Sequence, residues 1–352
     1  MTAAYDPARL PLLTGDLPGA GGRVVELEDF LVEEVPAYLP CGQGQHCMAL
    51  LRKRGMTTPE AVQVICQRLG LPAGAAGYAG MKDRRGVTTQ WISLDGVTPE
   101  RVMSLNEPGL EVLQAERHRN KLRTGHLRGN RFTVVLRDGV ADAADLARAA
   151  LQRLVEQGMP NYFGAQRFGR RGDNAIQGQQ MLKGEIKPPR QKFMKRLLIS
   201  AVQSWLFNEV LAQRIKRGCQ DSMLGGEVLM KLPGTGLFVS EDIEEDAPRL
   251  ARGEVVITGP ICGPRMTLPA LKSPALALEQ EVLEACGVSG GDLGNAGRLG
   301  RGGRRALMVT PEQAEVEAVE EGVKLSFILP PGSYATVLLR EITEGLKTPT
   351  TT

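Results

Sequence analysis

The stretch AGMKDRRGVTTQW, residues 79–91, joins a glycine-rich turn to a run that alternates like a β-strand. Glycines allow the backbone to turn tightly and to approach a ligand closely. Asp83 stands in this turn among three cations, Lys82, Arg84 and Arg85, and nearby positive charge favours the ionised form of a carboxylate. An ionised carboxylate on a tight turn is a candidate nucleophile or base. The competing interpretation is a solvated polar loop, because Gly-rich polar turns are common.

The residues around this turn predict a strand, a helix and a second strand. Residues 46–52 read as the first strand. Residues 57–69 are expected to be helical, because a capping threonine, a proline and an early glutamate open the segment and Gly70 closes it. Residues 87–94 read as the second strand, directly after Asp83. This order predicts a mixed α/β chain of the α+β class.

Other parts of the chain carry weaker signals. Longer helices are expected at 141–157 and 190–217, and further strands at 132–136, 306–309 and 323–328. Residues 23–36 are expected to form a strand, a short turn and a second strand. Residues 1–22 are rich in Pro and Gly and are expected to form a loosely held arm. The glycine-rich residues 287–305 are expected to form a flexible hinge or crossover. The arginines of that segment are candidate phosphate ligands: Arg298, Arg301, Arg304 and Arg305.

Length and composition limit the number of domains and the class of protein. At 352 residues the chain has room for two or three domains, and its 42% hydrophobic content is ordinary for a globular protein. The formal net charge is only +3, so the distribution of charge has to indicate whether nucleic acid is a partner. The sequence does not open on a basic segment followed by an apolar core, so no signal peptide is expected, and no run approaches the roughly 20 apolar residues that span a bilayer. These features predict a cytoplasmic protein.

Six cysteines and three histidines give little support for a metal site. Cys41, His46 and Cys47 lie close together, but no second pair of ligands follows at the spacing of a structural zinc site. Reduced and partly buried cysteines are the simpler interpretation. We therefore expect neither a metal ion nor a cofactor.

Two basic stretches are candidates for binding RNA. Residues 117–131 hold six fixed cations punctuated by glycines, and residues 158–171 combine arginines with aromatic rings. The alternatives are a solvated loop for the first stretch and a packed domain junction for the second. The candidate phosphate ligands are Arg119, Lys121, Arg123, Arg128 and Arg167, together with Lys82 and Arg84 of the turn.

Three separated motifs resemble the TruD-type tRNA pseudouridine synthase family. They are Gly80–Arg84 followed by Thr88 and Gln90, then Asn161–Gly169, then Phe327–Thr336. Together they extend over most of the chain. The resemblance implies that the chain isomerises a uridine of transfer RNA, at uridine 13 in the D-arm region, to pseudouridine. It implies no metal and no cofactor.

The resemblance also implies roles for particular residues. Asp83 would be the single essential carboxylate, acting as a nucleophile or as a base in an elimination route on a base flipped out of the RNA. A basic partner for the acid is usual in pseudouridine synthases, but Arg23 fits that spacing imperfectly and is left out of the catalytic set. The residues expected to surround the flipped uridine are Phe30, Asn130, Phe132 and Phe327.

The domain organisation implied by the resemblance is a catalytic domain interrupted by an insertion. The pseudouridine-synthase catalytic domain would comprise residues 1–157 plus 306–352. A large inserted α/β domain of the TRUD type would comprise residues 158–305, with an RNA-facing cleft between the two. A monomer is expected.

Two other functions stay open. A non-catalytic RNA-binding or RNA-folding protein would explain the basic stretches, but not the joint presence of Asp83, Thr88 and Gln90. An enzyme of nucleotide metabolism would need a phosphate loop such as GxxxxGK[ST], which the sequence lacks.

Overall fold

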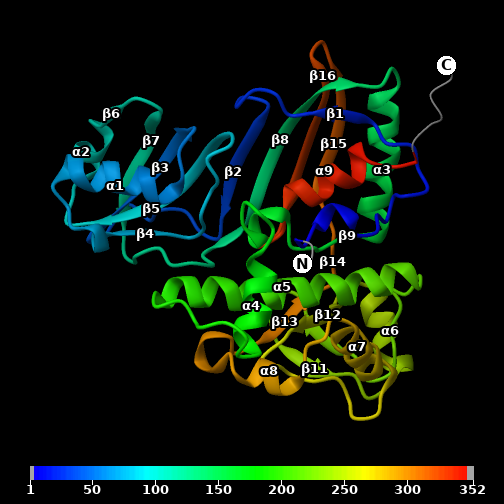
Figure 1. Ribbon diagram of the computed structural model, residues 1–352. Coiled ribbons are helices and arrows are strands. Elements are labelled where there is room, and N and C mark those ends of the chain that lie inside the picture. The colour runs from blue at the N-terminus through cyan, green and yellow to red at the C-terminus, as the bar shows by residue number, and fades with distance from the viewer. Residues whose placement is uncertain (1–3, 347–352) are drawn as a thin grey trace. The chain divides into compact units, whose positions relative to one another are not determined.

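The computed structural model describes residues 4–346, which divide into two compact units (Figure 1). The first, called the sheet unit, comprises residues 17–156, 311–335 and 342–346. The second, called the α5 unit after its long helix α5 (Lys192–Lys216), comprises residues 4–16, 157–310 and 336–341. None of the helices in these described residues is both long enough and apolar enough to cross a bilayer.

The two units differ from the predicted domains in the assignment of residues near the two ends of the described chain. The chain passes between the units after residues 156 and 310, close to the predicted boundaries. Residues 4–16 and 336–341, however, cluster with the α5 unit. The assignment of one part as catalytic and the other as inserted stays a prediction.

Residues 5–14 are held in place by hydrogen bonds within the α5 unit. The Tyr5 N–H donates to the Gly172 carbonyl at 3.0 Å. The Thr14 hydroxyl donates to the Glu341 carbonyl at 2.6 Å, and the Thr14 N–H donates to the Glu341 carboxylate at 3.0 Å. The prediction of a loosely held arm is therefore wrong for these residues, because their composition does not reveal the distant acceptors.

The sheet unit is built on one ten-stranded sheet in the order β15-β16-β8-β2-β5-β3-β7-β6, with β1 beside β8 and β4 beside β5. Its strands are β1 (Gly21–Arg23), β2 (Phe30–Pro36), β3 (His46–Arg54), β4 (Ala76–Tyr78), β5 (Val87–Asp95), β6 (Asn106–Glu107), β7 (Leu110–His118), β8 (Leu127–Gly139), β15 (Glu312–Val319) and β16 (Gly322–Leu329). These strands include those predicted at 46–52, 87–94 and 323–328. The mixed α/β class is confirmed.

One strand pair in this sheet is parallel. All neighbours run antiparallel except β2 and β5, where Leu31 pairs with Val87. Because parallel strands begin at the same edge of a sheet, the start of β2 lies beside the start of β5. Phe30 therefore stands next to the turn that carries Asp83.

Helix α1 (Thr58–Leu69) covers the β3–β5 part of this sheet and confirms the helix predicted at 57–69. Thr57 and Glu60 form a reciprocal capping box, and Gly70 ends the helix in the left-handed conformation with a φ of 66°. The core beneath it includes Cys47, Ala49, Leu51, Ile65, Ile92 and Leu94. The sheet unit also contains α2 (Pro99–Met103), and α3 (Ala143–Gln157) confirms the helix predicted at 141–157.

The α5 unit combines helices with a four-stranded antiparallel sheet in the order β11-β10-β12-β13. Helix α5 matches the predicted helix at 190–217, and its buried residues include Leu198, Val202 and Leu206. The other elements are β9 (Met159–Pro160), α4 (Asn174–Leu182), β10 (Val228–Lys231), β11 (Leu237–Val239), α6 (Ile243–Ala251), β12 (Val255–Ile261), α7 (Pro274–Ala285), α8 (Gly290–Gly294), β13 (Gly303–Ala306), β14 (Met308–Val309) and most of α9 (Ala335–Thr343).

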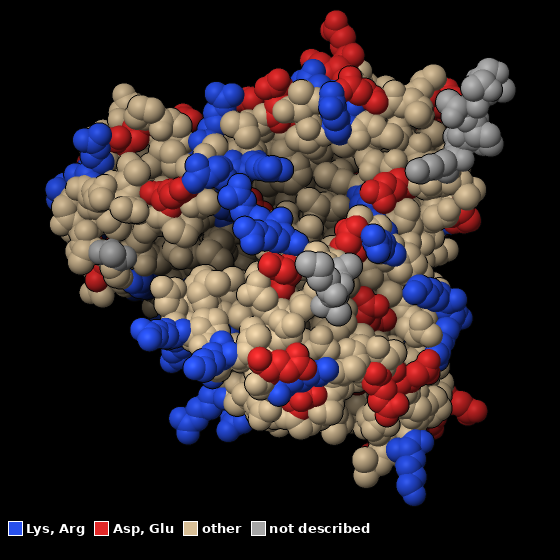
Figure 2. Space-filling view, viewed as in Figure 1, with Lys and Arg blue, Asp and Glu red and all other residues tan. Residues whose placement is uncertain are grey.

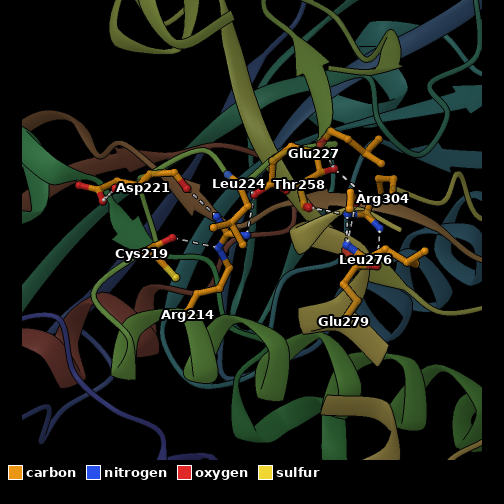
Figure 3. A network of polar contacts seen from close by, with 12 residues as sticks. Arg214, Cys219, Asp221, Leu224, Glu227, Thr258, Leu276, Glu279 and Arg304 are labelled. Atoms are coloured by element: carbon orange, nitrogen blue, oxygen red, sulfur yellow. Dashed lines mark hydrogen bonds and ion pairs between the residues drawn. The ribbon is translucent and has the colours of Figure 1, made fainter. Parts of the chain in front are cut away.

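The glycine-rich segment 287–305 is ordered structure rather than a free hinge. It forms α8, a short 3-10 turn at Gly297–Leu299 and β13. Arg304 of β13 is fully buried, and its guanidinium donates to both carboxylate oxygens of Glu279, at 2.6 and 3.1 Å (Figure 3). The prediction that Arg304 binds phosphate is therefore wrong, because this cation is committed to an internal carboxylate.

A second buried ion pair lies in the same network. Arg214 Nη1 is 2.7 Å from Glu227 Oε1, and both side chains are almost completely buried (Figure 3). The remaining donors of Arg214 reach the backbone carbonyls of Cys219 and Ser222 at 3.1 and 2.8 Å. Buried charges are tolerated when their partners and remaining donors are satisfied in this way.

Candidate active site

The backbone of the Asp83 turn is tied to α1 and β5. The Thr58 hydroxyl accepts a hydrogen bond from the Lys82 N–H at 2.8 Å and donates one to Gln90 Oε1 at 2.6 Å. The Gln90 side chain then donates from Nε2 to the Gly80 carbonyl at 3.2 Å. Gln90, a member of the predicted motif, therefore holds the turn.

The side chain of Lys53, near the end of β3, donates hydrogen bonds to the same turn. Its side chain is only 2% exposed, and its ammonium donates to the carbonyls of Met56 at 2.7 Å, Asp83 at 3.2 Å and Lys82 at 3.4 Å. Burial, followed by the positive charge of Lys82, lowers the pKa of Lys53 to about 8. The carbonyl of the proposed catalytic residue is thus bound directly by a buried cation.

Gly86 closes the turn against the start of β2. Its φ is +131°, and a Cβ at this position would stand 2.4 Å from the Phe30 carbonyl oxygen. Only glycine fits so close an approach. The Asp83 turn and Phe30 are therefore in direct contact.

Lys82 points inward and forms a buried ion pair. Its Nζ is 3.1 Å from Glu34 Oε2, and both side chains are almost fully buried. Burial raises the pKa of the Glu34 carboxyl, and the Lys82 ammonium opposes part of that shift. A direct contact between Lys82 and a phosphate would require this pair to open, so Lys82 is placed as a structural cation of the turn.

Asp83 itself is exposed, and its carboxylate has no hydrogen bond or ion pair within the described part of the chain. Two of its three cationic neighbours in sequence are committed elsewhere, since Lys82 pairs with Glu34 and Arg84 pairs with Glu60. The backbone of Asp83 is fixed while its carboxylate is left open to solvent.

The three predicted aromatic residues, on β2, β8 and β16, pack against one another. Phe132 pairs in register with Phe327, and their rings stack with centroids 5.4 Å apart. Phe30 meets Phe132 edge-on at 6.0 Å. Phe327 is fully buried, Phe132 nearly so and Phe30 half-buried, so Phe30 offers the most accessible ring and Phe327 supports Phe132 from behind.

Three polar side chains near these rings have atoms without hydrogen-bond partners in the described structure. Asn130 pairs in register with Glu34, and Thr88 pairs with Val32. Asn130 Oδ1, Glu34 Oε1 and Thr88 Oγ1 are all buried and have no hydrogen-bond partner in the described structure. Buried polar atoms are normally hydrogen-bonded, so these three atoms are candidate contacts for a polar ligand.

The basic residues predicted to bind phosphate lie mostly on the surface of the sheet unit. Figure 2 shows lysine and arginine side chains gathered over the middle of this unit, beside a recess that lies over its sheet. Arg119, Arg123 and Arg128 are exposed, and Lys121 is half-buried with its ammonium on the Gly74 carbonyl. Their segment is anchored to the turn, because the Gly125 N–H donates to the Ala79 carbonyl at 2.9 Å.

Arg167 belongs to the α5 unit. Its guanidinium lies over the Phe163 ring, 5.4 Å from the centroid, and its Nε is buried without a hydrogen-bond partner. The structure therefore places Arg167 in a different unit from the other candidate phosphate ligands. Arg23, left out of the catalytic set, pairs with Asp138 on the surface at 3.1 Å.

The described residues include no group of three or more His, Cys, Asp or Glu side chains that is arranged to hold a metal ion. Cys41 is exposed, whereas Cys47 is buried in the core beneath α1. The absence of a metal requirement stays a prediction.

Comparison with known proteins defines the family. The family described as tRNA pseudouridine synthase D (TruD) matches residues 10–189 and 189–342. The tRNA pseudouridine synthase D of Anaeromyxobacter dehalogenans is 44% identical over 96% of this chain and 97% of its own length. The corresponding protein of Thermus thermophilus is 43% identical over 97% and 94%. A crystal structure described as a putative TruD from Methanosarcina mazei has the same fold, with a TM-score of 0.77, 22% identity and coverage of 97% and 98%.

These matches cover nearly the whole chain. The protein is a pseudouridine synthase, an isomerase that acts on RNA. It belongs to the tRNA pseudouridine synthase D (TruD) family.

Proposed function

We propose that this chain converts uridine 13 of transfer RNA to pseudouridine, with Asp83 as the essential carboxylate. The observation that carries the proposal is the contrast within the turn: the backbone of Asp83 is fixed by a buried lysine while its carboxylate is exposed and unpaired. A rigid backbone with a free functional group is the arrangement that positions a reacting group without neutralising it. The names of the relatives supply tRNA as the substrate class.

The proposed reaction is an internal transfer in which atoms balance without a co-reactant. The bond between N1 of uracil and C1′ of ribose breaks, the base turns, and C5 bonds to C1′. The proton on C5 is then lost and N1 gains one. Asp83 acts either as the nucleophile or as the base that opens an elimination, and both routes require an ionised carboxylate.

The polar and aromatic groups near the turn are suited to a flipped uracil. The base presents one donor, N3–H, between two carbonyl acceptors, and the Asn130 amide supplies an acceptor and donors of matching kind. Its Oδ1 has no partner within the described chain and is therefore available to N3–H. Phe30 and Phe132 supply ring faces against which the base can pack.

Mapping pseudouridine on a transfer RNA transcript incubated with the protein tests the target. Conversion at uridine 13 alone is expected, and a transcript with cytidine at position 13 is expected to stay unmodified. Conversion at another position would overturn the target, and tight binding with no conversion would favour a non-catalytic RNA-binding protein. The proposal describes a monomeric cytoplasmic enzyme that uses no metal or cofactor.

Replacing Lys53 with methionine is expected to lower kcat by about 10- to 100-fold with little change in KM, because the Asp83 carbonyl loses its anchor and small displacements of a reacting group are costly. The rate of the unmodified protein is also expected to fall as pH rises through about 8, where Lys53 loses its proton and one hydrogen-bond donor. Single-turnover rates over a pH series measure both effects.

The matched control for this change is Arg52→Met. Arg52 is the preceding residue of β3, and it is an exposed cation whose side chain pairs with Glu111 at 3.3 Å. It is expected to leave kcat unchanged. A folded Lys53→Met protein with the original kcat would remove Lys53 from the positioning of Asp83.

Replacing Arg119, Lys121 and Arg123 together with alanine is expected to weaken tRNA binding and reduce the slope of log Kd against log salt by about 2, since each phosphate contact contributes about 0.7–0.9. Titrations at several salt concentrations measure the slope. The control removes three cations of the same unit that lie outside the basic stretch 117–131, Arg52, Arg68 and Arg101. An equal change of slope in both triple variants would contradict the assignment of the phosphate contacts.

A further inference from the structure

The chain leaves a single aromatic ring exposed. It has eight phenylalanines, five tyrosines and two tryptophans, all within the described residues. Of these fifteen side chains only Phe193, in the first turn of α5, is largely exposed to solvent, at 72%. Singly exposed apolar side chains are common on protein surfaces, so this ring is informative only together with the residues around it.

The segment that carries Phe193 is strongly basic. Residues 186–196 contain five cations and no acid. Among the described residues, none of these five cations forms an ion pair or a side-chain hydrogen bond. Figure 2 shows lysine and arginine side chains grouped at the left end of α5, where the helix begins. The cations are Lys187, Arg190, Lys192, Lys195 and Arg196.

The stability of α5 does not explain this arrangement. Cations in a first turn oppose the helix dipole, and Lys192 and Arg196, four residues apart, repel each other. Phe193 and Arg196 are three residues apart and so share one face of the helix. The ring and the cations are therefore presented together on a surface that is locally unfavourable without an anionic partner.

We propose that this surface, residues 186–196, binds unpaired nucleotides of the substrate RNA, with a base stacked on Phe193 and phosphates beside the five cations. Sequence-tolerant RNA binding combines a basic surface with exposed rings in this way. A protein partner would have to be strongly acidic, and a lipid surface would need a continuous apolar face, whereas the apolar face of α5 is buried in its own unit. The RNA partner rests on the proposed function.

The test measures Kd for a transfer RNA transcript by using the full chain with Asp83→Asn, so that no turnover occurs. Phe193→Ala is expected to weaken binding by about 5- to 100-fold, the usual effect of removing one stacked ring. Phe193→Trp is expected to bind as tightly as the parent, and Phe193→Leu as weakly as the alanine variant. The matched control is Leu271→Ala, a residue 85% exposed in the same unit, which is expected to have no effect.

Short RNA probes distinguish binding of a single strand from binding of a duplex. Phe193→Ala is expected to weaken binding of a ten-nucleotide oligouridine and to leave binding of a short RNA duplex unchanged. Unchanged Kd for transfer RNA in the alanine variant overturns the proposal, and so does full binding by Phe193→Leu, because a leucine has no ring on which a base can stack.

The outcome is distinguishable from a failure of the proposed function. If the unmodified chain converts uridine but its RNA binding does not depend on Phe193, only the proposed RNA-binding surface is rejected, and the proposed function is kept. If no uridine is converted but RNA binding does depend on Phe193, the proposed function is rejected, and the surface is kept as an RNA-binding site.

Discussion

Replacing Asp83 with asparagine is expected to lower uridine conversion by about 1,000-fold or more, while Kd for transfer RNA changes by less than about threefold. Asparagine has nearly the same shape but can act neither as a nucleophilic carboxylate nor as a base. The turn should keep its geometry, because its anchors are backbone groups: the Lys82 N–H and the carbonyls of Gly80, Lys82 and Asp83. Single-turnover assays with mapped transfer RNA measure the loss.

Asp95→Asn supplies the matched control, since Asp95 ends the same strand that Asp83 precedes and its side chain is 54% exposed. It is expected to keep the full rate. Turnover by Asp83→Asn within a factor of ten of the parent would exclude Asp83 as the essential acid and would shift attention to the buried Glu34 beside it.

Replacing Arg304 with methionine is expected to lower the free energy of unfolding by about 3–5 kcal/mol, the usual cost of leaving one member of a buried ion pair alone. Arg304 donates to both oxygens of Glu279 and also to the Thr258 carbonyl at 2.6 Å and the Thr258 hydroxyl at 3.0 Å. Methionine fills the space of the aliphatic stem but satisfies none of these acceptors. Urea denaturation of the full chain measures the change.

The pH dependence of this loss identifies its cause. Burial raises the pKa of the Glu279 carboxyl, and the charge of Arg304 opposes that shift. Without Arg304, Glu279 takes up a proton on folding more readily, and a group whose pKa is higher in the folded state is stabilising at low pH and loses that effect as pH rises. The deficit should therefore be smaller at pH 5 than at pH 8.

Arg217→Met is the control for the loss of a cation at the surface. Arg217 pairs with Glu281, and both side chains are about half exposed, so a change below about 1 kcal/mol is expected. A deficit of equal size in Arg304→Met and Arg217→Met, or one independent of pH, would contradict the assignment to an unpaired buried carboxylate.

The sequence was sufficient to predict the elements next to the turn because their signals are local. The capping box at Thr57 and Glu60 and the glycine at position 70 lie within one helix, and the structure places all three as expected. The prediction for residues 287–305 failed for the opposite reason. Glycines there allow close packing, and the partner of Arg304 lies 25 positions away on α7, which no local pattern reveals.

Two residues of the candidate site, Lys53 and Glu34, were missed although the sequence carries a signal for each. Lys53 continues the inward-facing series of β3 after Leu51, and Glu34 continues that of β2 after Val32. A charged residue at an inward position breaks the apolar alternation and marks a functional or strained site. Their actual contacts depend on the register of distant strands, so the pairing with Lys82 and the Asp83 carbonyl could not be predicted.

The register of β16 on β8 also has a consequence for protein synthesis. Phe327 and Phe132 are neighbours in the sheet but about 200 residues apart in the chain, and contacts of such separation form late in folding. A nascent chain can complete the Asp83 turn, α1 and β5 well before β16 leaves the ribosome. It then holds the carboxylate proposed to react, while Phe327, which stacks on Phe132, is still missing. The complete site therefore exists only in a finished chain, and products of premature termination should be catalytically silent.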